Sequence, residues 1–88
     1  MMDFRPGMVV RSKAGRDKGD LFIVLQTEDN FAYIANGILR KVHRPKKKKL
    51  MHLQISGYVS QMIVDKLEVN EEITDCMVRK ALAEYSEN

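Results

Sequence analysis

Short apolar runs separated by turn signals constrain the fold of this 88-residue chain more than any other feature. Runs rich in β-branched and aromatic residues are typical of strands, and the Gly, Pro, Asn and Asp residues between them are typical of turns. These runs are Met8–Ser12, Leu21–Leu25, Phe31–Ala35, Ile38–Val42 and Leu50–Ile55. Because a sheet of such short strands must curl to hide its edges, the pattern predicts a small antiparallel β-barrel.

Asn36-Gly37 lies between two of these runs and is the strongest hairpin signal in the chain. Asparagine and glycine tolerate the positive φ that both central residues of a type I′ turn require. A two-residue turn pairs Tyr33 with Arg40, which places an aromatic ring and a guanidinium on one face of the hairpin. The pattern does not settle which face points inward, so this pair is a candidate binding platform only.

The sequence changes character after Gly57, where we expect the last strand to end. Residues 58–69 are mixed in pattern and predict no definite element. Apolar residues then recur with a helical period after Thr74, a suitable N-cap; the stripe is Val78, Ala81, Leu82 and Tyr85. We expect residues 1–57 to form the barrel and residues 58–88 to form an acidic extension. Its amphipathic helix should pack on the barrel within a single folding unit.

Charge is distributed unevenly along the chain, although its formal net value is only +3. Residues 1–53 hold 12 Lys or Arg against 5 Asp or Glu, whereas residues 54–88 hold 3 against 7. A basic body with an acidic end is typical of a protein that binds a polyanion on one part of its surface. The run Lys46–Lys49 is not expected to pack inside the protein, and we interpret it as a source of electrostatic attraction.

Several kinds of site lack the residues that they need. Cys76 is the only cysteine, which excludes an intramolecular disulfide and a cysteine-based zinc site, and His43 and His52 have no further ligands at metal-binding spacing. No paired carboxylates, activated nucleophile or phosphate-binding strand-loop-helix signature is present. We therefore expect no catalysis, no metal and no cofactor. The chain also lacks a signal-peptide core and a run near the roughly 20 apolar residues of a membrane span, so we expect a cytoplasmic protein without membrane contact.

Three segments resemble, in their order and spacing, the KOW module. They are residues 7–19, which contain Ala14-Gly15-Arg16-Asp17-Lys18-Gly19, residues 35–42 with the hairpin signal, and residues 44–53 with the lysine run. Within that superfamily the chain is similar to short RNA-binding proteins related to a large-subunit ribosomal protein of archaea and eukaryotes. The resemblance implies a mainly β fold, a small SH3-like barrel of about five short antiparallel strands with a C-terminal α-helix, that binds structured RNA in the translation apparatus.

The acidic end of the chain departs from those ribosomal relatives, whose extensions tend to be longer and basic. A ribosome-associated or assembly role is therefore open beside constitutive ribosomal membership. Ribosomal RNA is the expected partner and ribosomal proteins are further candidates, while the free protein is expected to be a monomer.

The loop from Ala14 to Gly19 is the predicted contact element. Its glycines permit positive φ and close backbone approach, so the loop can present N–H groups, Arg16 and Lys18 to a phosphate. Asp17 is expected to brace the loop through its own backbone. The same charges would also suit a merely solvated loop, but the resemblance favours binding. The predicted RNA-binding residues are Arg11, Lys13, Gly15, Arg16, Lys18, Gly19, Arg40, Lys41, Arg44, Lys46, Lys47, Lys48 and Lys49.

A protein-interaction adaptor is the alternative function, because KOW and SH3-like barrels also bind proteins of transcription and translation. A groove for proline-rich peptides is disfavoured, since the chain has no Trp and few aromatic residues. The apolar helix stripe is interpreted as core, although Met62 and Met77 could serve an adaptable interface.

Overall fold

The first three strands begin at the residues that the apolar runs predict. The computed structural model describes residues 4–87, and in it the strands are β1 (Met8–Ser12), β2 (Leu21–Glu28) and β3 (Phe31–Ala35). Each pairs antiparallel with the next, with Val10 opposite Phe22 and Val24 opposite Ile34. β2 continues beyond the predicted end at Leu25, because a β-bulge between Val24 and Gln26 lets its second half stay paired with β3.

The predicted hairpin at Asn36-Gly37 is wrong. The fourth strand is β4 (Lys46–Lys49), and it pairs antiparallel with β3, so that Tyr33 lies opposite Lys47 and not Arg40. A type I′ turn needs positive φ at both central residues, but only Gly37 has it, with φ of 78°. The side-chain oxygen of Asn36 instead accepts hydrogen bonds from the backbone N–H groups of Ile38 (3.0 Å) and Arg40 (2.9 Å). The residues after Gly37 therefore form a loop rather than a strand.

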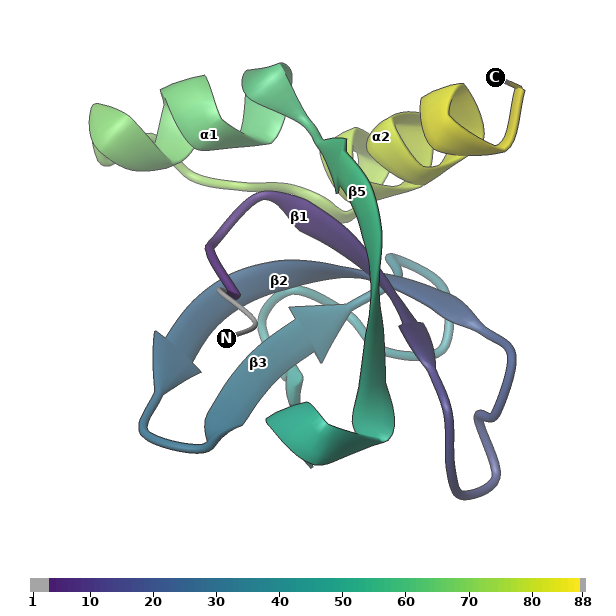
Figure 1. The fold of residues 1–88 in the computed structure, drawn as a ribbon. Coiled ribbons are helices and arrows are strands. Elements are labelled where there is room, and N and C mark those ends of the chain that lie inside the picture. Colours follow the sequence, from purple (N-terminus) through teal and green to yellow (C-terminus); the bar gives the residue numbers. More distant parts are fainter. Residues whose placement is uncertain (1–3, 88) are drawn as a thin grey trace.

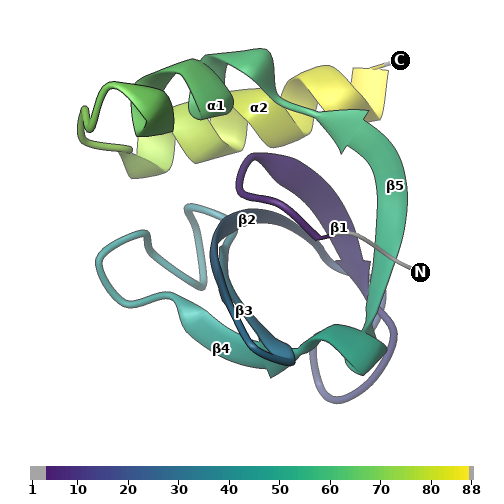
Figure 2. The same cartoon turned by 60° about the vertical axis from the view of Figure 1, so that its left-hand side comes forward.

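The fifth strand returns to the start of the sheet. A single 3-10 turn (Leu50–His52) leads into β5 (Leu53–Val59), which passes through Gly57 instead of ending there and pairs antiparallel with β1. The strand order is β4-β3-β2-β1-β5. Figure 2 shows how strongly this sheet curls. The predicted mainly β fold of five antiparallel strands is thus confirmed, as one curved sheet whose edge strands β4 and β5 have no pairing with each other among residues 4–87.

Two helices follow the sheet and lie side by side against one side of it (Figures 1 and 2). α1 (Gln61–Glu68) occupies the segment for which the sequence predicted no definite element, and the hydroxyl of Ser60 caps it by accepting from the N–H of Ile63 at 3.4 Å. α2 (Asp75–Glu87) is the predicted helix, and the expected N-cap Thr74 accepts from the N–H of Met77 at 3.2 Å. Neither helix in the described part of the chain is long and apolar enough to cross a bilayer.

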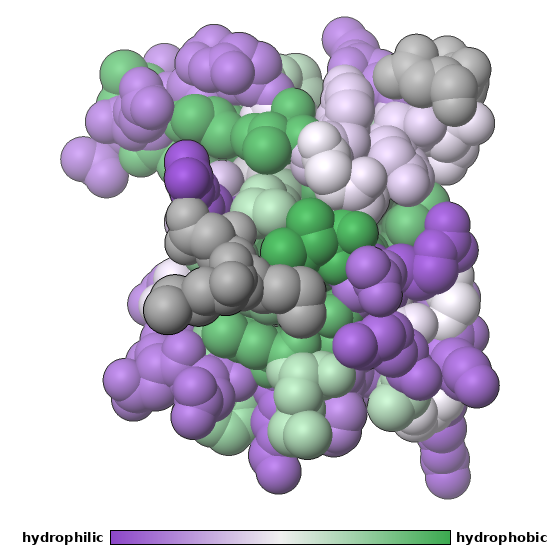
Figure 3. Space-filling model, viewed as in Figure 1, coloured by the Kyte–Doolittle hydropathy of each residue, from purple (hydrophilic) through white to green (hydrophobic). Residues whose placement is uncertain are grey.

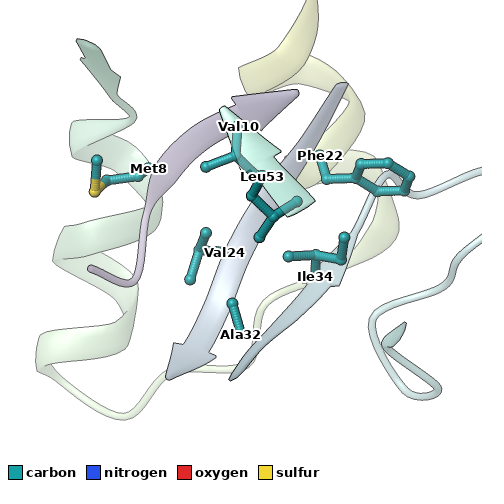
Figure 4. Packing of buried hydrophobic residues seen from close by; sticks show 7 residues of the cluster. All are labelled: Met8, Val10, Phe22, Val24, Ala32, Ile34 and Leu53. Carbon is teal, nitrogen blue, oxygen red and sulfur yellow. The ribbon is translucent and has the colours of Figure 1, made fainter. Parts of the chain in front are cut away.

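Alternating side chains of β1 and β2 build two apolar layers. Met8, Val10, Phe22, Val24, Ala32, Ile34 and Leu53 form one cluster inside the curl of the sheet (Figure 4). Val9 and Ile23 point to the other face, where they meet Ile63 of α1 and Val78 and Ala81 of α2. All five of these residues are fully buried. The helix stripe is therefore core, as predicted, and the first halves of β1 and β2 are buried on both faces.

α2 also fixes the loop between β3 and β4. The carboxylate of Asp75 accepts a hydrogen bond from the N–H of Val42 at 2.8 Å, and the guanidinium of Arg79 donates to the carbonyl of Gly37 at 2.7 Å. Gly37 is buried against the helix, and a Cβ atom there would lie 2.6 Å from the carbonyl oxygen of Asp75. The acidic extension thus holds a segment of the basic body in place.

Gly37→Ala should destabilise the protein more than Gly57→Ala. Both glycines have positive φ, 78° and 85°, so either alanine incurs a backbone strain of about 1–2 kcal/mol. Only Gly37 has atoms within contact range of the added carbon, and these include backbone atoms that cannot rotate away. We therefore expect urea denaturation to show a loss for Gly37→Ala that exceeds the loss for Gly57→Ala by about 1–3 kcal/mol. Equal losses would contradict the close packing of this loop on α2.

Candidate nucleic-acid interface

The loop between β1 and β2 has an ordered backbone of its own. The N–H of Gly19 donates to the carbonyl of Ser12 at 2.9 Å, the N–H of Ser12 donates to Asp20 at 3.0 Å, and the N–H of Lys18 donates to Gly15 at 3.2 Å. Gly15 and Gly19 have φ of 86° and 94°, which confirms that both turns use the conformation that glycine favours. The loop therefore presents its side chains from a defined frame.

Lys48 is buried beneath this loop and anchors it. Its side chain is only 7% exposed, and its ammonium donates to the carboxylate of Asp17 (2.6 Å), the hydroxyl of Ser12 (2.8 Å) and the carbonyl of Ala14 (2.8 Å). Three acceptors match the three N–H donors of the ammonium. The prediction that the lysine run cannot pack inside the protein is therefore wrong for Lys48, which is not open to a phosphate.

Alternation along β4 explains why one lysine is buried while its neighbours are exposed. Lys48 lies opposite the buried Ala32, whereas Lys47 and Lys49 point to the other face of the strand and are exposed. Lys46, on the same side as Lys48, donates to the second carboxylate oxygen of Asp17 at 2.9 Å. The lysine run is thus a two-sided strand, with one face inside the protein and one in solvent.

Asp17 braces the loop through the lysine side chains of β4, and not through its own backbone as expected. Its carboxylate also accepts from the hydroxyl of Ser12 at 2.7 Å. Burial by itself raises the pKa of Asp17, yet the hydrogen bonds from Lys48, Lys46 and Ser12 outweigh it and hold the pKa well below its usual range. The carboxylate therefore stays charged, and the pair stays intact, at all ordinary pH values.

Some of the exposed cationic side chains contact other residues of the protein, and others make no such contact among the described residues. Arg11 donates to the carbonyl of Gly19 at 2.7 Å, and Lys47 lies 3.7 Å from the carboxylate of Glu28 and 4.6 Å from the ring of Phe31. The remaining predicted contact residues make no side-chain hydrogen bond or ion pair within residues 4–87; they are Lys13, Arg16, Lys18, Arg40, Lys41, Arg44 and Lys49. Hydrophilic side chains cover the end of the molecule where the β1–β2 loop lies (Figures 1 and 3).

An open cavity of about 360 Å³ brings the two predicted basic segments together. Arg16 of the β1–β2 loop, Arg40 of the β3–β4 loop and Lys46 of β4 all line it. The other lining residues are Asp17, Asp20, Phe22, Asn36 and Leu39. We call this space the loop cavity. Lys41 and Arg44 are exposed but do not line it.

The expected pairing of Tyr33 with Arg40 does not occur, but a different cation lies near the same ring. The ammonium of Lys47 is 5.9 Å from the centre of the Tyr33 ring, and the Tyr33 hydroxyl donates to Glu28 at 2.9 Å. The rings of Phe31 and Tyr33 are half-buried on the outer face of β3. The aromatic face is therefore separate from the loop cavity.

Several important residues were not predicted from the sequence. Sequence did not predict a role in the site for Ser12, Asn36, Asp75 or Leu39, because their partners or their exposure depend on how the loops lie in space. His43 and Cys76 are exposed, and no cluster of three or more His, Cys, Asp or Glu suited to a metal occurs in the described ranges.

No protein-family model matches the chain, and a search of curated proteins finds no significantly similar sequence. The resemblance to the KOW module therefore stays a prediction from the residues that carry it.

Lys48→Ala should destabilise the protein far more than Lys49→Ala, its neighbour in the same strand. Removal of Lys48 leaves the mostly buried carboxylate of Asp17 with Lys46 as its one remaining counter-charge. Loss of one partner of a fully buried ion pair costs about 3–5 kcal/mol, and the remaining Lys46 places the expected loss at the lower end of that range. Lys49 is exposed and makes no side-chain hydrogen bond or ion pair within residues 4–87, so its removal should change stability by less than about 0.5 kcal/mol. Denaturant midpoints at neutral pH measure the difference, and similar values for both variants would contradict the buried role of Lys48.

Asp17 should also make the protein sensitive to acid. Its folded-state pKa lies below the unfolded value of about 3.9, so its contribution to stability is fully present above that value. The contribution is lost progressively as the pH falls from about 4 toward the folded-state pKa. We expect urea denaturation between pH 6 and pH 3 to show a steeper loss for the wild type than for Asp17→Asn. If the stability of the two proteins fell in parallel with pH, the Asp17 carboxylate would have the same pKa in the folded and the unfolded state, which would contradict the prediction.

Proposed function

We propose that this chain is a non-catalytic RNA-binding protein of the KOW type, which contacts ribosomal RNA or another structured RNA of the translation apparatus. The observation that carries the proposal is the position of Arg16 and Arg40. These two guanidiniums come from segments far apart in the sequence, line one cavity and have no partner side chain among the described residues. Free guanidiniums that share a site suit bidentate contacts with phosphate oxygens.

The strand arrangement supports the fold part of this proposal. Four consecutive strands form a meander, a 3-10 turn follows, and the fifth strand returns to pair with the first. This order, together with the curl of the sheet, supports an SH3-like barrel as the proposed fold. Because such barrels serve many functions, the fold alone does not identify the ligand, and the basic surface must do so.

The braced loop gives a physical reason for binding at this place. A flexible loop loses conformational freedom when it binds, and that loss weakens affinity. Here the backbone hydrogen bonds and the contact of Asp17 with Lys48 order the loop beforehand. Arg16 and Lys18 are then presented to RNA with only their own side chains left to be ordered.

The position of the acidic extension fits the same function. α1 and α2 lie at the opposite end of the molecule from the tip of the β1–β2 loop (Figure 1). Carboxylates close to a bound phosphate would repel it, and salt screens this repulsion as the separation grows. The extension can thus hold the β3–β4 loop through Asp75 and Arg79 without opposing RNA binding.

An adaptor function has one observation in its favour. A second cavity, of about 640 Å³, lies between the start of the chain and α1, and Pro6, Val59, Val64 and Leu67 give it an apolar lining. It shares no residue with the loop cavity. A protein partner bound there would be insensitive to charge reversal at Arg16 and Lys18, which separates the two functions experimentally.

The double variant Arg16→Glu/Lys18→Glu should abolish RNA binding while leaving the fold intact, because both side chains are exposed and unpaired within the described residues. Filter binding to ribosomal RNA and co-sedimentation with ribosomal subunits measure the loss. If about six phosphates are neutralised, the slope of log K against log salt should be near −4 to −5 for the wild type.

The control for net charge is Lys66→Glu/Lys80→Glu, which makes the same change in net charge on α1 and α2. It also removes the exposed ion pair of Lys66 with Glu71, a loss of about 1 kcal/mol or less. It should keep most of the RNA affinity, because those lysines lie outside the basic surface. Equal losses of RNA affinity in the two double variants would mean that net charge alone, and not the position of Arg16 and Lys18, determines binding. A flat salt response of the wild type would contradict phosphate contact altogether.

A further inference from the structure

We propose that the loop cavity holds one unpaired base of the RNA, with guanine as the best fit, while Arg16 and Arg40 hold the phosphates on either side of it. This inference rests on the proposed function and adds the part of the RNA that enters the cavity. The observation behind it is that carboxylates, an amide and a leucine line the cavity together with the cations, whereas a phosphate site requires mainly cations and N–H donors.

A phosphate inside the cavity would meet negative charge. Asp17 and Asp20 both line the space. The oxygens of Asp17 are already used by Ser12, Lys46 and Lys48. The carboxylate of Asp20, by contrast, is exposed and makes no hydrogen bond or ion pair to the residues that the structure describes. An unpaired carboxylate repels a phosphate but accepts hydrogen bonds from the N–H groups on the edge of a base.

Asn36 supplies the complementary group. Its side-chain oxygen is occupied by the backbone N–H groups of Ile38 and Arg40, which fixes the orientation of the amide. Its NH₂ group has no partner in the described part of the chain, and the residue lines the loop cavity. Asn36 is therefore left as a donor and Asp20 as an acceptor on the walls of one space.

This pair of groups matches one base better than the others. The pairing edge of guanine carries one acceptor, O6, beside two donors, N1–H and N2–H₂. A carboxylate can accept from both donors at once while an amide NH₂ donates to O6. Uracil presents a single N–H between two acceptors, so one of its oxygens would face the carboxylate. The cavity thus favours a base with adjacent donors.

Leu39 provides an apolar surface for the face of the base. Its side chain is 79% exposed although it lines the cavity, and the neighbouring Ile38 is 63% exposed. An exposed leucine between two basic segments has no role in phosphate binding, whereas the flat face of an unstacked base is apolar and gains from such a contact.

The geometry also selects the kind of RNA. In regular A-form RNA the bases are stacked and their major-groove edges are out of reach of side chains. A base can enter a cavity between two loops only if it is already unpaired, as in a bulge, an internal loop or a hairpin loop. We therefore expect the protein to prefer RNA that contains such a base over a continuous duplex.

Three RNA hairpins test the inference; they share one stem, which is closed by a non-nucleotide linker so that no loop base is present. One is fully paired, one has a single bulged guanosine and one has a single bulged uridine. Fluorescence anisotropy should show the guanosine bulge bound about tenfold more tightly than the paired stem, which is the size expected for capture of one base. Leu39→Ala should lower the affinity for both bulged hairpins toward that of the paired one. Asp20→Asn should remove the preference for guanosine over uridine.

Two control variants lie away from the cavity. Asp29→Asn removes an exposed carboxylate at the other end of β2, in a turn with φ of 51° that asparagine accepts, and Val69→Ala shortens an apolar side chain that is also exposed. Both should leave the three affinities unchanged. Circular dichroism checks that all four variants keep their fold.

The outcomes separate this inference from the proposed function. Equal affinity of the wild type for the three hairpins, with binding still abolished by Arg16→Glu/Lys18→Glu, overturns the base site and leaves RNA binding standing. A loss of affinity for the paired hairpin in Leu39→Ala equal to that for the bulged ones also overturns it. Absence of RNA binding at low salt overturns both proposals.

Discussion

The ion pair between Lys48 and Asp17 is the contact on which the candidate interface depends. An ammonium can be buried only when its charge is paired and its donors are satisfied, and here Asp17, Ser12 and Ala14 supply all three acceptors. The acceptors belong to the end of β1 and to the β1–β2 loop, while the lysine comes from β4. One buried charge therefore joins the end of β1 and its loop to β4, although β2 and β3 lie between these strands in the sheet.

A strand made of four lysines cannot set its own register. A shift of β4 by one residue would bring a different lysine inward without any change in side-chain chemistry. The register must come from the flanking residues. Leu50 donates its N–H to the carbonyl of Asn30 at 2.8 Å and packs on the core inside the curl, which fixes the end of the strand. Because Leu50 fixes the register of β4, Lys48 is the lysine that points inward.

The elements that sequence predicts well here are those defined by local pattern. β1, β3 and α2 follow from β-branched runs, turn residues and a helical period with its cap. The prediction of a hairpin at Asn36-Gly37 was wrong because the amide of Asn36 and the contacts of Gly37 with α2 stabilise a loop instead. α1 was missed because it spans only eight residues, so its apolar residues recur over too few turns to distinguish a helix from a continuation of the strand before it.

The candidate site shows the same division. Sequence could predict the exposed positions of Arg16 and Lys18 on the β1–β2 loop and the positive φ of the glycines beside them, because loop glycines next to cations are a local signal. The burial of Lys48 could not, since the four lysines look alike in sequence and only the pleat of β4 distinguishes them.

The two walls of the loop cavity are held by different parts of the chain. The wall with Arg16 is fixed by the pairing of Asp17 with β4, and the wall with Arg40 is fixed by contacts of α2 with the β3–β4 loop. The width of the cavity therefore depends on both the sheet and the C-terminal extension. An acidic helix can thus serve the proposed basic site, because Asp75 and Arg79 in its first turns fix the wall that carries Arg40. The extension then serves the proposed interface through the side chains of Asp75 and Arg79, which hold the β3–β4 loop, and not by contact with the RNA.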